Sequence, residues 1–359
     1  MKYREALVSD LPANEGLYYM NQYPKTSRKT LMLIWPAGLF LCFFLNIPPT
    51  SAQEIHVAGG VINRNDDGEK SYSWLISYFE GINEHFAWSL SWLNEGHLPD
   101  HHRDGPSVQF WGRKYLLDQR LSLAVGAGPY FVFDSNREGM AGDNYENVHK
   151  LGGLFSFTAT WYMKTRWLLQ TRLENVWLDG DMDTTSILLG VGYQLSPPGA
   201  PGSAETPASE KQAYNKPKNE ITLFMGYTNM NGPADNDFAV SAEYRRDIAP
   251  YLGWTVGWIQ EIDTPEVDRH GVATQLWGTK TFFHDLLGLG AGFGIYVFTD
   301  DARDPKSGID DGLRAAGLAT LTASYRLTRR FDIRASWHRT VTDYDRDSDI
   351  FLCGLGYRF

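Results

Sequence analysis

Two short acidic segments carry the residue types that bind hard divalent cations. The first, DGDMD, contains Asp179, Asp181 and Asp183, and the second, DYDRD, contains Asp343, Asp345 and Asp347. Alternating carboxylates suit Ca²⁺ or Mg²⁺, although the later glycine and glutamate of an EF-hand loop are absent. Closely spaced aspartates also form turns through local hydrogen bonds. The sequence therefore leaves open either a cation site or a hydrogen-bonded turn in these segments, and no cofactor is required.

The segment IRASWHRTVTDYDRDSDIF near the C-terminus contains the residue types of a hydrolytic site. His338 has the chemistry of a general base, Thr340 that of a nucleophile, and Asp349 that of a carboxylate that orients the base. This segment resembles the last two strands of lipid A deacylases of the PagL type, which are small eight-stranded barrels. The resemblance implies an acyl hydrolase acting on lipid A (LPS), with Thr340 in place of the family's serine and Asp349 in place of its glutamate.

Strand alternation places these candidate groups on different faces. Because side chains alternate along a strand, Asp349 shares a face with Phe351, whereas His338 lies on the face opposite Trp337. The candidate groups reach one site only if a β-bulge shifts the register. Without a bulge, His338 is expected to be a buried histidine held by its polar neighbours.

The chain alternates apolar with small or polar residues in eight segments before residue 196 and eight after residue 219. In the segment 287–297, for example, leucine, alanine, phenylalanine, isoleucine and valine alternate with glycine and one tyrosine. The connections alternate between tight turns and long acidic loops, a pattern typical of transmembrane β-barrels. No stretch after residue 52 has the unbroken apolar length of a membrane helix. The predicted fold class is therefore all-β, a transmembrane antiparallel β-barrel.

The chain also contains an internal duplication. Residues 54–134 align with 220–300 without a gap, and residues 146–195 align with 310–359. A repeat of this length indicates two copies of one domain. The predicted division is a signal peptide with an extended N-terminus at 1–52, a first barrel repeat at 53–196, a linker rich in Pro, Ala, Gly and Ser at 197–218, and a second barrel repeat at 219–359.

The inward positions favour two narrow barrels. Side chains just fill an eight-stranded barrel, so its lumen should combine small residues with a few large polar ones. The repeated large members are Glu95 and Glu261, Arg103 and Arg269, Gln109 and Gln275, and Trp111 and Trp277. Buried polar groups need partners, so these repeated residues predict a hydrogen-bonded plug in each lumen. The alternative is a polar pathway through the barrel.

The long linker also favours two tandem eight-stranded barrels, which we expect to separate in mild detergent after proteolysis of the linker. The alternative is one sixteen-stranded barrel, which would form a channel.

The last strand ends in Tyr357 and Phe359, a pattern that resembles the insertion signal of bacterial outer-membrane barrel proteins. The resemblance implies the barrel-insertion machinery as a partner, outer-membrane lipid or LPS as the surroundings, and the bacterial outer membrane as the location. The formal net charge of −10 argues against nucleic acid as a partner. The expected function is a non-enzymatic envelope-structural or surface-interaction role, with lipid A hydrolysis and a channel as alternatives.

Overall fold

The computed structural model describes residues 53–137, 146–196, 217–230, 237–262, 268–300 and 312–359. The expected signal peptide and nearly all of the expected linker lie outside these ranges. Within them, no helix is long and apolar enough to cross a membrane.

Sixteen antiparallel strands make up the described structure. The first eight are β1 (Gln53–Arg64), β2 (Lys70–Gly81), β3 (Phe86–Leu98), β4 (His101–Leu116), β5 (Leu121–Asn136), β6 (Glu146–Tyr162), β7 (Trp167–Trp177) and β8 (Thr184–Gln194). The second eight are β9 (Asn219–Met230), β10 (Asp237–Ala249), β11 (Leu252–Ile262), β12 (Arg269–Phe282), β13 (Leu287–Asp300), β14 (Leu313–Arg326), β15 (Phe331–Val341) and β16 (Ser348–Arg358).

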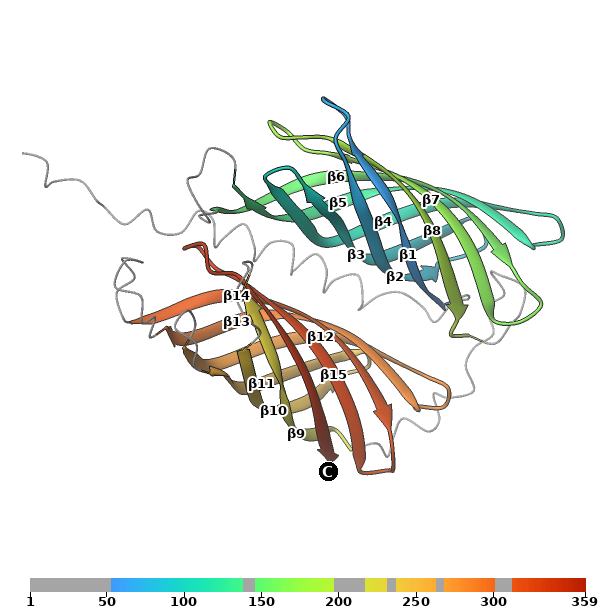
Figure 1. The fold of residues 1–359 in the computed structure, drawn as a ribbon. Helices are drawn as coiled ribbons and strands as arrows, with labels where there is room; N and C mark the ends of the chain where they lie inside the picture. The colour runs from blue at the N-terminus through green and yellow to red at the C-terminus, as the bar shows by residue number, and fades with distance from the viewer. Residues whose placement is uncertain (1–52, 138–145, 197–216, 231–236, 263–267, 301–311) are drawn as a thin grey trace, which may run out of the picture.

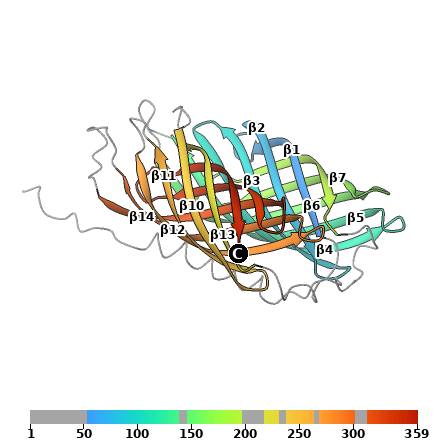
Figure 2. The same ribbon diagram turned by 90° about the horizontal axis from the view of Figure 1, so that it is seen from below.

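Each set of eight strands closes on itself. Strand β1 pairs with β8 through partners such as Val57 and Val191, and β9 pairs with β16 through partners such as Leu223 and Leu355. Figure 1 shows the two closed barrels lying side by side, and Figure 2 shows the same arrangement from below. The prediction of two tandem eight-stranded barrels is confirmed. The alternative of one sixteen-stranded barrel is wrong, because hydrogen bonding closes after the eighth strand.

The alternating pattern gives each barrel an apolar outer surface. On β8, Ile187, Leu189 and Val191 point outward and are exposed, whereas Leu188 between them is fully buried. A closed barrel satisfies its backbone groups between strands, so this surface can face hydrocarbon. In each barrel, the start of the first strand and the end of the last strand lie beside turns such as 82–85, at what we call the turn end. Connections such as 178–183 lie at the opposite end, the loop end. In transmembrane barrels the short turns are periplasmic.

Both lumens are filled by the same packing of tryptophan on glycine. The indole Nε1 of Trp111 donates to Ser89 Oγ at 2.9 Å, and its ring lies so close to Gly126 that an added Cβ would be 2.5 Å away. In the second barrel, Trp277 donates to Thr255 Oγ1 at 2.9 Å and lies against Gly292 in the same way. The two barrels therefore contain the same packing unit, which leaves no room for a larger side chain at the glycine.

This packing predicts that Gly126→Val destabilises the first barrel by about 1–3 kcal/mol, because the new side chain must displace the Trp111 ring. Urea unfolding in detergent, followed by tryptophan fluorescence, measures the change. Gly112→Ala is the control, since an added Cβ at Gly112 meets no atom within 4 Å. Equal stability of the two variants would contradict the account of the lumen.

Candidate functional site

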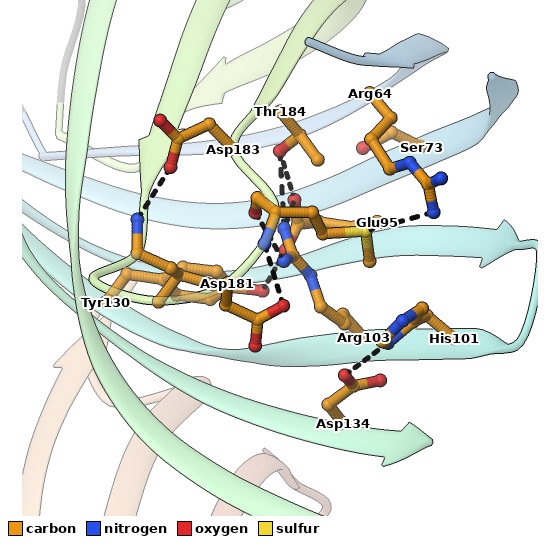
Figure 3. A network of polar contacts seen from close by, with 12 residues as sticks. Arg64, Ser73, Glu95, His101, Arg103, Tyr130, Asp134, Asp181, Asp183 and Thr184 are labelled. Atoms are coloured by element: carbon orange, nitrogen blue, oxygen red, sulfur yellow. Dashed lines mark hydrogen bonds and ion pairs between the residues drawn. The ribbon is translucent and has the colours of Figure 1, made fainter. Parts of the chain in front are cut away.

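A buried ion pair spans the first lumen near its loop end (Figure 3). Arg103 on β4 donates from Nε and Nη2 to the Glu95 carboxylate on β3 at 3.0 and 2.7 Å, and both side chains are fully buried. Tyr130 donates its hydroxyl to Glu95 at 3.2 Å, and Thr184 also donates to this carboxylate. Arg103 Nη1 donates to the Met182 carbonyl at 2.8 Å. The pair thus joins opposite walls of the barrel.

A glycine bulge on β3 follows Glu95, whose side chain points into the lumen by strand alternation with Ser91 and Leu93. The pairing of β3 with β4 shifts between Asn94 and His97, and Gly96 between them has a φ of +69°. An added Cβ at Gly96 would also be 2.1 Å from the Tyr72 carbonyl oxygen. Only glycine fits this bulge, because other residues rarely adopt a positive φ and the space is occupied.

A second layer closes the first lumen nearer its middle. Gln109 Nε2 donates to Ser156 Oγ at 2.9 Å, and Arg172 Nη2 donates to Gln109 Oε1 at 2.7 Å. Arg172 also pairs with Glu174 at 2.5 Å and lies over the Trp111 ring at 5.0 Å. Hydrogen bonds and ring contacts therefore fill the lumen at two levels.

The second lumen is also closed by a buried ion pair, but its arginine, Arg269, has a different partner from that of Arg103. Arg269 pairs with Asp300 at 3.1 Å, and Glu261 accepts hydrogen bonds from Thr228 at 2.7 Å and Ser348 at 3.1 Å. In the layer below, Gln275 donates to Thr320 at 2.8 Å. The structure thus places the repeated Glu, Arg, Gln and Trp residues of both copies inside their lumens.

The proposed hydrolytic residues are not brought together. His338 lies in the lumen with Nδ1 2.9 Å from Thr320 Oγ1, and Thr340 is hydrogen bonded to Ser348 Oγ at 2.7 Å. Asp349 lies on the outer face and pairs with Arg339 at 2.8 Å. The register of β15 with β16 runs without a bulge from Phe331 to Thr340. The hydrolase site stays a prediction that this geometry does not support.

The acidic loops use their carboxylates for local and nearby bonds. Asp181 pairs with Lys150 at 2.7 Å, and Asp183 accepts from the Leu178 backbone amide at 2.9 Å. Burial alone would raise the pKa of Asp181, but the hydrogen bonds from Lys150 and the Met182 amide outweigh it and lower the pKa. Asp179 and Asp343 are exposed in the two loops. Among the described residues, no group of three or more His, Cys, Asp or Glu side chains is placed to hold a metal ion.

Charged side chains on the outer faces meet at a contact between the barrels that we call the seam. At its turn end, Glu80 of β2 forms an ion pair with Lys280 of β12. Glu80 is fully buried and also accepts from the Tyr78 hydroxyl at 2.9 Å. The Lys280 ammonium lies over the rings of Tyr78 and Tyr251 at 5.8 and 5.7 Å. Each charge at this end therefore depends on the other barrel.

The seam continues toward the loop end through aromatic and charged groups. The rings of Trp92 and Trp337 pack across it with centroids 4.3 Å apart. Trp337 Nε1 donates to Asp349 at 2.9 Å, and the guanidinium of Arg339 lies over the Phe133 ring of the first barrel at 5.7 Å. Arg339 is also attracted electrostatically to Asp104 of the first barrel.

The start of β6 and the loop between β15 and β16 close the seam at the loop end. His149 Nε2 donates to Asp347 Oδ2 at 2.8 Å, and the Asn147 backbone amide donates to Asp345 Oδ1 at 2.7 Å. Burial alone would raise the pKa of Asp347, but His149 and Arg339 outweigh it and hold the pKa below its usual value. The seam therefore runs the full height of the barrels.

The sequence expectations missed this seam, although strand alternation contains a signal for it. The repeat alone does not, because Trp92 and its counterpart Trp258 are the same residue although they are 4% and 39% exposed in the structure. Glu80 and Arg339 lie on faces that the alternation assigns to lipid, where charges are costly unless covered. The expectation that the two halves separate after cleavage of the linker did not include these contacts, and the structure predicts instead that they stay together.

Among known proteins, similarity to this chain is found only with solved structures. The chain matches no protein-family model. It also matches no curated protein. The N-terminal β-barrel domain of Pseudomonas aeruginosa OprF is similar at 13% identity with a TM-score of 0.32, over 40% of this chain and 98% of that domain. Neisserial surface protein A is similar at 14% identity with a TM-score of 0.31, over 39% and 97%. The outer membrane protein Omp33 of Acinetobacter baumannii gives 10% identity and a TM-score of 0.18, over 86% and 99%.

Proposed function

We propose that this outer-membrane β-barrel protein is a non-enzymatic component of the bacterial envelope that works through the outer surface of two joined barrels. The observation that carries the proposal is the seam, where charged residues on the outer faces are buried by the neighbouring barrel. Such residues have no use on two independent barrels surrounded by lipid. They suit a protein whose barrels form one fixed unit.

The closed lumens support this role over transport. In the first barrel, the Glu95–Arg103 pair and the layer around Gln109 lie at successive depths. In the second, Arg269–Asp300 and Gln275 occupy equivalent depths. An ion crossing either barrel would have to break buried ion pairs, which is costly in a low-dielectric interior.

The energy of exposed charge explains why the seam must form. A lysine or arginine facing lipid costs roughly 2–4 kcal/mol at the bilayer midplane and about 0–1 kcal/mol near the interface, and carboxylates cost less. Glu80 and Lys280 lie near the turn end, so their individual cost is at the lower end of this range. Arg339 lies deeper than the loop residues and is covered on both sides, by Asp349 of its own barrel and Phe133 of the other.

The surroundings proposed for this unit are outer-membrane lipid and LPS. The aromatic rings of Tyr357 and Phe359 lie on the outer face of the second barrel, stacked with centroids 6.1 Å apart. This exposed pair on the final strand supports the proposal that the barrel-insertion machinery binds the C-terminus.

The non-enzymatic role is tested in cells and in planar bilayers. We expect the mass of lipid A to be unchanged when the protein is expressed, and the purified protein to give no large steady conductance. Mass spectrometry of lipid A and single-channel recording make the two measurements, with His338→Ala as the matched variant. Loss of an acyl chain only when His338 is intact would contradict the proposal, as would a conducting pore.

The seam predicts that the two halves stay together after cleavage of a protease site introduced within residues 198–216. Lys280→Met should weaken this association by roughly 2–5 kcal/mol, because it leaves Glu80 buried without its cation. Size-exclusion chromatography in mild detergent measures the association. Lys114→Met is the control, since Lys114 is the repeat counterpart of Lys280 and is exposed on the outer face of the first barrel. Equal association of the two variants would contradict the role of the ion pair.

The seam is also expected to weaken in acid. Because the folded pKa of Asp347 is depressed, its contribution is fully present above the unfolded aspartate pKa of about 3.9 and is lost as pH falls through the lower folded value. Cleaved protein should therefore dissociate increasingly below about pH 4. Asp347→Asn should weaken the seam at pH 7 and reduce its dependence on acid. A variant as acid-sensitive as the parent would show that another group controls the seam.

A further inference from the structure

A cavity of about 580 Å³ lies in the seam between the outer faces of the two barrels. Its lining is almost entirely apolar and includes Ile76 and Leu90 of the first barrel and Leu289, Leu321 and Cys353 of the second. The volume is within the roughly 300–1,000 Å³ of typical ligand pockets. Because outer faces surround it, the cavity belongs to the membrane side of the wall and not to either lumen.

Small outward residues on the second barrel create this cavity. Ala291 and Cys353 line it, whereas the first barrel carries Val125 and Leu189 at the corresponding positions. Those two counterparts are 61% and 68% exposed on an ordinary outer face. The second copy is thus hollowed on the face that meets the first barrel.

The two ends of the cavity differ in chemistry. Toward the loop end, the packed rings of Trp92 and Trp337 lie in its wall. Toward the turn end, its lining reaches Lys280, whose side chain is 16% exposed and is paired with Glu80. An apolar interior with a cation at one end matches a phospholipid, with its chain inside and its phosphate at the turn end.

We propose that this cavity holds an acyl chain of a glycerophospholipid from the periplasmic leaflet, with the headgroup phosphate at Lys280. The proposal rests on the proposed function, since the cavity exists only while the barrels are joined. Water does not fill such a space, because a buried water needs polar partners. The leaflet follows from the position of Lys280 at the turn end, which is periplasmic in transmembrane barrels.

Native mass spectrometry of the full-length protein, purified in mild detergent, tests the proposal. We expect about one glycerophospholipid to stay bound to the parent protein and to Leu189→Phe, and at least tenfold less to Cys353→Phe, which fills the cavity. Leu189→Phe is the matched control, because Leu189 is the repeat counterpart of Cys353 on the face away from the cavity lining. Equal retention by the two variants would overturn the proposal. Lipid A as the bound species would overturn the assigned leaflet.

The reactivity of Cys353 gives a second readout without a variant. It is the only cysteine in residues 53–359, and it is exposed at the cavity wall. We expect a maleimide to label it at least tenfold more slowly before lipid extraction than after. Equal rates would overturn the proposal. Cleavage of the linker in the same samples separates the two ideas: halves that stay joined without bound lipid overturn the lipid site alone, whereas halves that separate overturn the joined barrels.

Discussion

Charge on a lipid-facing surface is the constraint on which the arrangement of this molecule depends. Glu80 and Arg339 occupy outward positions on their strands, and the other barrel covers each of them. A strand cannot turn these residues inward without also turning its apolar residues into the lumen. Contact between the barrels avoids the cost of leaving these charges in lipid, a cost that is larger for the deeper Arg339 than for Glu80 near the turn end. The aromatic contact of Trp92 with Trp337 adds packing to the same surface.

The polar residues of the chain form two sets: one fills the lumens, and the other lies at the seam between the barrels. Inside each barrel, a buried ion pair occupies the matching place with a change of partner, Glu95 with Arg103 in the first copy and Asp300 with Arg269 in the second. At the seam, some charged residues are the same in both copies, as with Lys280 and Lys114, and others differ, as with Glu80 and its counterpart Arg246. The two barrels share an interior pattern because each of them must fold. Their outer faces can differ, because only one face of each copy meets the other.

The barrels themselves could be predicted from the sequence because strand alternation and the repeat are local properties. The glycine and tryptophan positions, such as Gly126 and Trp111, also indicated a filled lumen. The seam could not be predicted in the same way. Glu80 and Lys280 are 200 residues apart, and their meeting depends on how each barrel is rotated about its axis. The alternation did mark Glu80 as a charge on a lipid face. It carried no information on which residue would cover it.

The central claim is that the seam forms in the membrane, and a chemical cross-link tests it most directly. Cysteines replacing Trp92 and Trp337, in a Cys353→Ser background with a cleavable linker, can be joined by a short bismaleimide in intact outer membranes before denaturing electrophoresis. The account predicts that the cleaved chain runs at full mass, and that cysteines at Leu189 and Trp337 give two halves. Two separate halves from the Trp92 and Trp337 pair would contradict it.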